Sequence, residues 1–227
     1  MTWPSEAPRE ARPTEAESYR ILRSRIDLSR LPKHSRDVTE RVIYATADFD
    51  YATDLVCDEE ALAVAVAALA AGAPVVADGA MVAAGITSSP VVCKIGEPLT
   101  MRLARTVGIS VPAAAIRLAF GEVGPGAVWV VGGVPAALTE ILTRGVEPGF
   151  VIGLPAGFVV AAAAKDALRA SGIRSVSNVS EKGGAVAAAA ALEALLRSAV
   201  AVKGSRAGWG AGGGPARTVP PLPTADR

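Results

Sequence analysis

The stretch that decides the fold lies at residues 72–86 and reads Gly72-Ala-Pro-Val-Val-Ala-Asp-Gly-Ala-Met-Val-Ala-Ala-Gly-Ile86. Its β-branched run is followed directly by Ala- and Gly-rich residues typical of a turn and a helix. The same alternation continues downstream and predicts strands at residues 74–77, 91–94, 128–131, 150–153 and 174–177. Strands that alternate with helices are typical of a parallel sheet covered on both faces. We therefore predict an α/β fold with a doubly wound, mainly parallel sheet of about five strands.

Upstream of this stretch the pattern is helical. Ser18 can cap a first helix, in which Tyr19, Leu22 and Ile26 recur at spacings of three and four. Further helices are predicted at residues 35–47 and 59–71. The composition predicts a disordered leader at 1–15, a folded domain at 16–200 and a flexible Gly/Pro-rich tail at 201–227.

The overall charge excludes one class of partner. The net charge is +1, and Lys and Arg are not gathered into a strip interleaved with aromatic residues. Such a composition does not indicate a nucleic-acid-binding surface. Hydrophobic residues make up 51% of the chain but aromatic residues only 4%, so close packing of small side chains is expected.

The apolar runs and the cysteines bear on location. Asp78 interrupts the run at 73–86, and Glu193 and Arg197 interrupt the run at 183–202, so no membrane span is predicted. Two cysteines far apart in a chain without a signal-peptide pattern indicate free thiols in a reducing cytoplasm.

Glycines and prolines cluster where three predicted strands end, at residues 132–135, 153–157 and 181–184. The carboxyl ends of parallel strands share one sheet edge, where ligands bind. These turns suit a carboxylate- or phosphate-bearing ligand, or they carry Gly and Pro for backbone reasons alone. None matches a P-loop or a dinucleotide-binding turn, and no metal site is predicted.

Several collinear blocks resemble one family. Besides residues 72–86, they are Ser18-Tyr19, Arg41-Val-Ile-Tyr-Ala-Thr-Ala-Asp48, Gly133-Val-Pro-Ala-Ala-Leu138 and Ile152-Gly-Leu-Pro-Ala-Gly-Phe-Val159. Together with Lys165 and Gly183-Gly184 they make residues 17–198 resemble the precorrin-8X methylmutases. The resemblance implies an isomerase of cobalamin biosynthesis that moves a methyl group from C11 to C12 of an acidic corrinoid.

The resemblance also implies that no cofactor is needed and that the protein is a homodimer, with N-terminal helices packing at the dimer interface. It places the ring against the turns at 85–87, 132–135, 155–158 and 182–184, and Lys165 and Lys182 can pair with its carboxylates. The substrate-binding residues expected from it are Ser18, Thr87, Gly133, Pro135, Gly157, Lys165, Lys182, Gly183 and Gly184.

Tyr44 stands where the family has its catalytic His. A phenol titrates about 3.5 pKa units above an imidazole, which corresponds to about 5 kcal/mol less proton-donating free energy. Tyr44 is the candidate catalytic residue as a substitute acid, and two other roles stay open. It is alternatively a stacking platform for a flat ring, or a core aromatic at helical spacing from Val38 and Val42.

Other family residues are also replaced. Val111 replaces a family Arg that can bind a carboxylate, and Ala163 replaces a family Glu. Gly133 replaces an Asn, and Arg25 replaces a Glu of the first helix. The family brings these segments to one pocket. The alternative hypotheses are therefore a non-catalytic paralogue that binds a tetrapyrrole or a protein partner, and an isomerase redirected to another substrate.

Six further residues have expected roles. Asp78 is expected to be buried and structural, since a carboxylate between apolar runs needs hydrogen-bond donors. Asp48 either orients the Tyr44 hydroxyl or caps the helix end. His34, in a predicted connection, is expected to be exposed. Three arginines make the first helix basic, either as a solvated face, which is favoured, or as a replacement anion grip: Arg20, Arg23 and Arg25.

Overall fold

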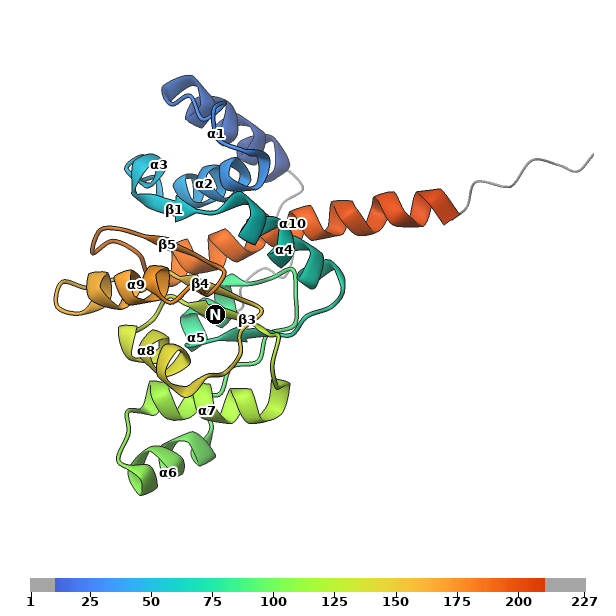
Figure 1. Ribbon diagram of the computed structural model, residues 1–227. Helices are drawn as coiled ribbons and strands as arrows, with labels where there is room; N and C mark the ends of the chain where they lie inside the picture. Colours follow the sequence, from blue (N-terminus) through green and yellow to red (C-terminus); the bar gives the residue numbers. More distant parts are fainter. Residues whose placement is uncertain (1–10, 211–227) are drawn as a thin grey trace, which may run out of the picture.

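The computed structural model describes residues 11–210, and the side chains of residues 14–203. One five-stranded sheet forms its centre, with the strand order β1-β5-β4-β3-β2 (Figure 1). Strands β2 to β5 pair in parallel, and β1 pairs with β5 in antiparallel orientation. The strands are β1 (Leu55–Cys57), β2 (Val75–Ala77), β3 (Val128–Val131), β4 (Phe150–Gly153) and β5 (Ser175–Asn178).

Helices cover both faces of this sheet, which confirms the α/β fold. The parallel strands follow one another in chain order, so the sheet contains no reversal of strand order. The helices are α1 (Ala11–Arg25), α2 (Lys33–Thr46), α3 (Tyr51–Asp54), α4 (Glu59–Ala70), α5 (Ala80–Gly85), α6 (Pro98–Val107), α7 (Val111–Val123), α8 (Pro135–Arg144), α9 (Ala161–Ala170) and α10 (Ala185–Gly210).

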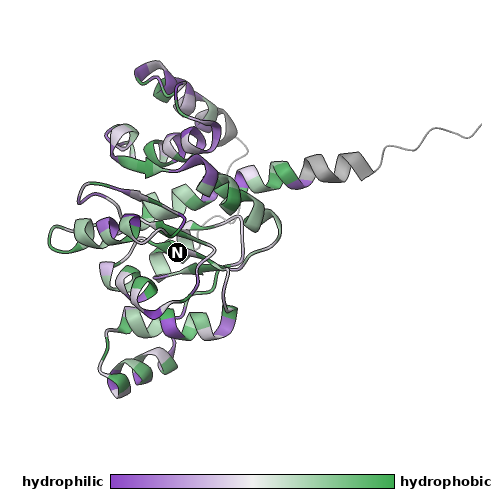
Figure 2. Ribbon diagram, viewed as in Figure 1, coloured by the Kyte–Doolittle hydropathy of each residue, from purple (hydrophilic) through white to green (hydrophobic). Residues whose placement is uncertain are grey.

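Alternate residues of each strand pack into different cores, because successive side chains of a strand point to opposite faces. Val128 and Val130 contact the core formed with α2, α4 and α10. Trp129 and Val131 contact the second core, formed with α7, α8 and α9. The strands and α10 are mainly hydrophobic, whereas α1 is largely hydrophilic (Figure 2).

One predicted strand does not form, and one strand was not predicted. Residues 91–94 make only an isolated parallel bridge, between Val92 and Val76. Pro90 lacks the backbone donor needed to extend this pairing. Strand β1 was missed because three residues are too short to show a period, and its pairing partner β5 lies more than a hundred residues away. Strand β5 begins one residue later than predicted.

The helix boundaries also differ from the predictions. Helix α1 begins at Ala11, inside the predicted leader, and α10 continues to Gly210, inside the predicted tail. The rest of both segments lies outside the described residues. Ser18 does not cap α1 but lies within it, where its hydroxyl donates to the Thr14 carbonyl at 2.8 Å. His34 was predicted to be exposed, but it is half-buried on α2, and its backbone N–H donates to Glu59.

Residues Ala185–Lys203 of α10 are long and apolar enough to cross a membrane, but 67% of the most apolar stretch is buried inside the protein. Helices α6 and α7 meet the same criteria only when they are joined across a bend of 114°. The apolar side chains of α10, such as Leu192 and Leu195, pack in the core with α2 and α4. This packing accounts for the hydropathy of α10.

Candidate functional site

Tyr44 and Ser18 lie in the same cavity, which has a volume of about 240 Å³ between α1 and α2. Arg25 of α1 and Phe49, which follows α2, complete its wall. Helix α2 buries Val38, Val42 and Ile43 against α10, and this leaves Tyr44 half-buried at the flank of the helix. The structure therefore brings together two residues that the sequence predicted to belong to one site.

The Tyr44 ring packs in an internal stack. The ring of Tyr19 lies parallel to it, with centroids 4.9 Å apart and an angle of 7° between the planes. The guanidinium carbon of Arg41, one turn earlier on α2, lies 5.0 Å from the Tyr44 centroid. Tyr19 covers one face of the Tyr44 ring. A flat ligand would therefore have to displace Tyr19 to stack on that face, or stack elsewhere.

The turn after α2 is tied to the sheet edge by Lys182. The Lys182 ammonium donates to Asp48 at 2.8 Å and to Asp50. The Lys182 hydrogen bond holds the pKa of Asp48 below its usual value. Asp48 also accepts from the Asp50 N–H at 3.0 Å, which is a local role. Lys182 thus connects the Tyr44 region to the turn that carries Gly183 and Gly184.

Lys165 is fully buried and its ammonium is fully used. It donates to the Asn178 side chain at 2.8 Å and to the carbonyls of Ser180 and Lys182. Burial lowers the pKa of Lys165 to about 8. Lys165 therefore fixes the loop that follows β5, and this geometry does not favour direct pairing with a ligand carboxylate.

Asp54 holds the same loop from the other side and was missed in the sequence. Its carboxylate accepts from the Asn178 amide, from the N–H groups of Val179 and Ser180, and from the Ser180 hydroxyl. Despite the opposing effect of burial, these bonds keep the pKa of Asp54 below its usual value. The available signal was an Asp directly before the short apolar run Leu55–Cys57.

Asp78 directly follows β2, and its side chain reaches the turn after β3. Its carboxylate accepts from the N–H groups of Gly132 at 3.2 Å, Gly133 at 2.8 Å and Val134 at 3.1 Å. Only 3% of Asp78 is exposed, and burial raises the pKa of its carboxyl. The prediction that Asp78 is buried and structural is confirmed. Because Asp78 binds these donors, the turn before Pro135 does not offer them to an anionic ligand.

Glu193 of α10 fixes the turn that carries Thr87. Its carboxylate accepts from the Thr87 N–H at 2.6 Å, from the Ser88 N–H at 3.0 Å and from the Ser88 hydroxyl at 2.6 Å. Glu193 is itself buried, whereas Thr87 is exposed. No local pattern indicates this contact, because the two segments are more than a hundred residues apart in the chain.

The turn after β4 exposes apolar side chains, and the turn after β5 contains a tightly fitted glycine. Phe158 is 95% and Val159 is 91% exposed, directly after Gly157. In the second turn, Gly183 has a φ of +146°, and a Cβ on it would collide with the Leu154 carbonyl. Gly184 donates its N–H to the same carbonyl at 2.7 Å. The Lys182–Gly184 segment is therefore fitted against the end of β4.

The positions that the family resemblance assigns to one pocket do not all lie close together within a single chain. Val111 begins α7, and Figure 1 shows α7 and the α1–α2 pair at opposite ends of the molecule. Tyr44 and Ser18 lie at one end, while Gly133, Pro135, Gly157 and Gly183 follow the strands at the sheet edge. Within residues 14–203, no cluster of three or more His, Cys, Asp or Glu side chains is placed to hold a metal ion.

Comparison with known proteins gives consistent matches over this chain. The family model for precorrin-8X methylmutase matches residues 13–198. A precorrin-8X methylmutase of Sinorhizobium sp. is 35% identical over 192 residues, which are 79% of this chain and 91% of the relative. A cobalt-precorrin-8 methylmutase of Methanocaldococcus jannaschii is 34% identical, over 70% of this chain and 77% of the relative.

Solved structures give the same result. The crystal structure of a precorrin-8X methylmutase from Thermus thermophilus superimposes with a TM-score of 0.77 at 29% identity, covering 85% of this chain and 98% of that chain. A precorrin-8X methylmutase related protein has a TM-score of 0.70, also at 29% identity, covering 79% of this chain and 98% of that chain.

Proposed function

Because the chain belongs to the precorrin-8X methylmutase family, we propose that it is a cobalamin-biosynthesis isomerase that moves a methyl group from C11 to C12 of precorrin-8X or cobalt-precorrin-8. Such a rearrangement requires the enzyme to hold a carboxylated ring and to donate a proton to it. Tyr44 is the proposed proton donor. Ser18, Thr87 and the turns that contain Gly133, Pro135, Gly157, Gly183 and Gly184 hold the ring.

The observation that supports this assignment best is the shared cavity of Ser18 and Tyr44. It is connected through the Lys182 ion pairs to the turn at the carboxyl edge of the sheet. The proposed role of Lys165 is to position that turn, and Lys182 fixes the turn to the end of α2.

The test is turnover of precorrin-8X, followed by its visible spectrum. We expect Tyr44→Phe, which keeps the ring stack but removes the hydroxyl, to lower kcat at least tenfold with a small change in KM. Tyr44→His restores an imidazole, and we expect it to raise kcat by about tenfold or more, because an imidazolium is the stronger acid. A Tyr44→Phe variant with the full wild-type rate removes Tyr44 from the mechanism.

The second candidate is a non-catalytic protein that binds a corrinoid. The observation that favours it is the packing of Tyr44 against Tyr19 and Arg41, which gives the ring a structural role without chemistry. Binding of precorrin-8X without turnover by the wild-type protein, together with turnover by Tyr44→His, would support this candidate. Absence of both binding and turnover argues against both corrinoid functions.

The proposal includes a cytoplasmic homodimer. Two features support the dimer: Val111 and Tyr44 lie on opposite ends of one chain, and Phe158 and Val159 expose apolar surface at the ligand edge (Figure 1). A second copy would cover that surface and bring the α6–α7 end of one protomer toward the α1–α2 end of the other.

A further inference from the structure

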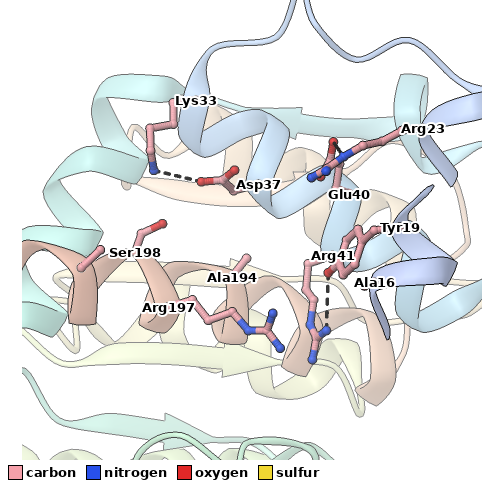
Figure 3. A pocket seen from close by; sticks show the side chains of 11 residues that line it. Ala16, Tyr19, Arg23, Lys33, Asp37, Glu40, Arg41, Ala194, Arg197 and Ser198 are labelled. Carbon is pink, nitrogen blue, oxygen red and sulfur yellow. Dashed lines mark hydrogen bonds and ion pairs between the residues drawn. The ribbon is translucent and has the colours of Figure 1, made fainter. Parts of the chain in front are cut away.

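A second cavity, of about 540 Å³, lies between α1, α2 and α10 (Figure 3). Its charged lining consists of four cationic and two anionic side chains, an excess of two positive charges: Arg23, Lys33, Arg41, Arg197, Asp37 and Glu40. Arg23 pairs with Glu40, and Lys33 pairs with Asp37, so the excess resides in Arg41 and Arg197.

Arg41 and Arg197 converge on one carboxylate oxygen. Both guanidinium groups donate to Oε1 of Glu15, Arg41 at 2.9 Å and Arg197 at 3.0 Å. These hydrogen bonds, with that from Arg197 the strongest, lower the pKa of Glu15. The Nε of Arg41 is buried and has no hydrogen-bond partner among the described residues. The arginine pair therefore suits a carboxylate, and the buried Nε of Arg41 is a donor that the described residues leave unused.

The helix that supplies Glu15 is held loosely. Leu22 is the one buried side chain among residues 14–25, and the other contacts of α1 are mostly ion pairs and the Tyr19–Tyr44 stack. Exposed ion pairs contribute about 1 kcal/mol or less each. The Glu15 side chain is itself 37% exposed, so a competing carboxylate from solvent can reach the arginine pair.

We propose that Arg41 and Arg197 form a binding site for a carboxylate of an acidic ligand, and that Glu15 fills this site until the ligand displaces it. The ligand class rests on the proposed function, in which the ligand is a carboxylated corrinoid. Arg41 contacts the Tyr44 ring, so a carboxylate on Arg41 lies next to the Tyr44 cavity. Displacement of Glu15 also loosens α1, which forms one wall of that cavity through Ser18 and Ile21.

The test measures the Kd of hydrogenobyrinic acid by calorimetry for wild type, Glu15→Gln, Arg197→Met and the double variant. Arg197→Met removes a charged donor and should raise Kd about tenfold. Glu15→Gln removes the internal competitor and should lower Kd about threefold. In the Arg197→Met background, the effect of Glu15→Gln should shrink, since the two changes act on one contact.

Glu17→Gln is the matched control, because Glu17 lies on the same helix and pairs with the exposed Arg20; its Kd should equal that of wild type. If Glu15→Gln and Arg197→Met shift Kd in the same direction, or not at all, the inference is overturned and the contact merely fastens α1.

A citrate titration separates this inference from the proposed function. If wild type fails to bind hydrogenobyrinic acid but binds citrate with the opposite shifts for Glu15→Gln and Arg197→Met, the corrinoid function fails and the carboxylate site stands. If wild type binds neither ligand, both are overturned.

Discussion

At the scale of single residues, most buried charges of this protein are bound to its own turns. Lys165, Asp78 and Glu193 each bond backbone groups of a different loop at the ligand edge. Asp78 was predicted from the sequence to be buried between apolar runs, whereas Lys165 was expected to pair with a ligand carboxylate. Their partners were not predicted, because each partner comes from a segment brought near only by the fold.

We expect Lys165→Met to lower the free energy of unfolding by about 3 kcal/mol, since it removes the donor to the buried Asn178 side-chain oxygen and one of two donors to the carbonyls of Ser180 and Lys182. Urea unfolding measures the change. Lys203→Met, at an exposed position, is the control and should change stability by less than about 0.5 kcal/mol. Equal stability of the two variants would contradict the role assigned to Lys165.

The pH dependence of stability has a definite sign at Lys165. Burial lowers the pKa of this group to about 8 in the folded protein, against 10.5 for an unperturbed lysine. Between these values the unfolded chain holds a proton that the folded protein has released, so this group makes the free energy of unfolding rise with pH. Below about pH 8 both states are protonated and the effect is absent.

The measurement is urea unfolding of wild type and Lys165→Met at several pH values from about 7 to about 10. The difference in unfolding free energy between wild type and variant should increase toward high pH. A difference that stays constant over this range would show that Lys165 has an ordinary pKa in the folded protein.

At the scale of elements, the predictions succeeded where the signal was local. The runs at 74–77, 128–131 and 150–153 are β-branched and bounded by Gly or Pro, and they form strands β2, β3 and β4 as predicted. Strand β1 and the failed strand at 91–94 depend on long-range pairing instead. The Ser18–Tyr44 cavity was accessible only through the family resemblance, since neither residue has a local signal that marks a site.

The contact between α10 and the turn after α5 gives a prediction for one element. Glu193→Gln keeps the side-chain shape but removes the charge that accepts the Thr87 and Ser88 N–H groups. We expect the free energy of unfolding to fall by about 2 kcal/mol and the Thr87 and Ser88 amides to exchange faster with solvent. Hydrogen exchange followed by mass spectrometry measures both effects.

Glu60→Gln is the control, because Glu60 is exposed on α4; its exchange pattern should match that of wild type. Unchanged protection of residues 87–88 in Glu193→Gln would mean that the turn is held by something other than this carboxylate.

At the scale of the whole molecule, residues assigned to one site lie at opposite ends of the fold, at α1–α2 and at α7 (Figure 1). The proposed dimer must bring these two ends together. Phe158 and Val159 are adjacent in the chain, and both are more than 90% exposed. Large apolar side chains exposed side by side mark an interaction surface. The proposed dimer uses this surface.

We expect sedimentation to give twice the chain mass of 23.0 kDa for wild type. Phe158→Asp should shift the protein to the monomer, because it places a charge in the proposed contact, and should leave its circular dichroism unchanged. Val200→Asp is the matched control, because Val200 is 67% exposed on α10, whereas Phe158 follows β4. A Phe158→Asp protein that remains dimeric removes Phe158 from the interface.

The packing of α10 also constrains how the protein is made. Leu192 and Leu195 of α10 share a core with Val42 of α2 and Leu62 of α4, so the first helices find their main apolar partner only when nearly the whole chain has been translated. At about 5–20 residues per second, α2 waits roughly 7–30 s on the ribosome for α10. During that interval its apolar face is a substrate for chaperones, and truncation before residue 185 should yield an aggregating chain rather than a smaller domain.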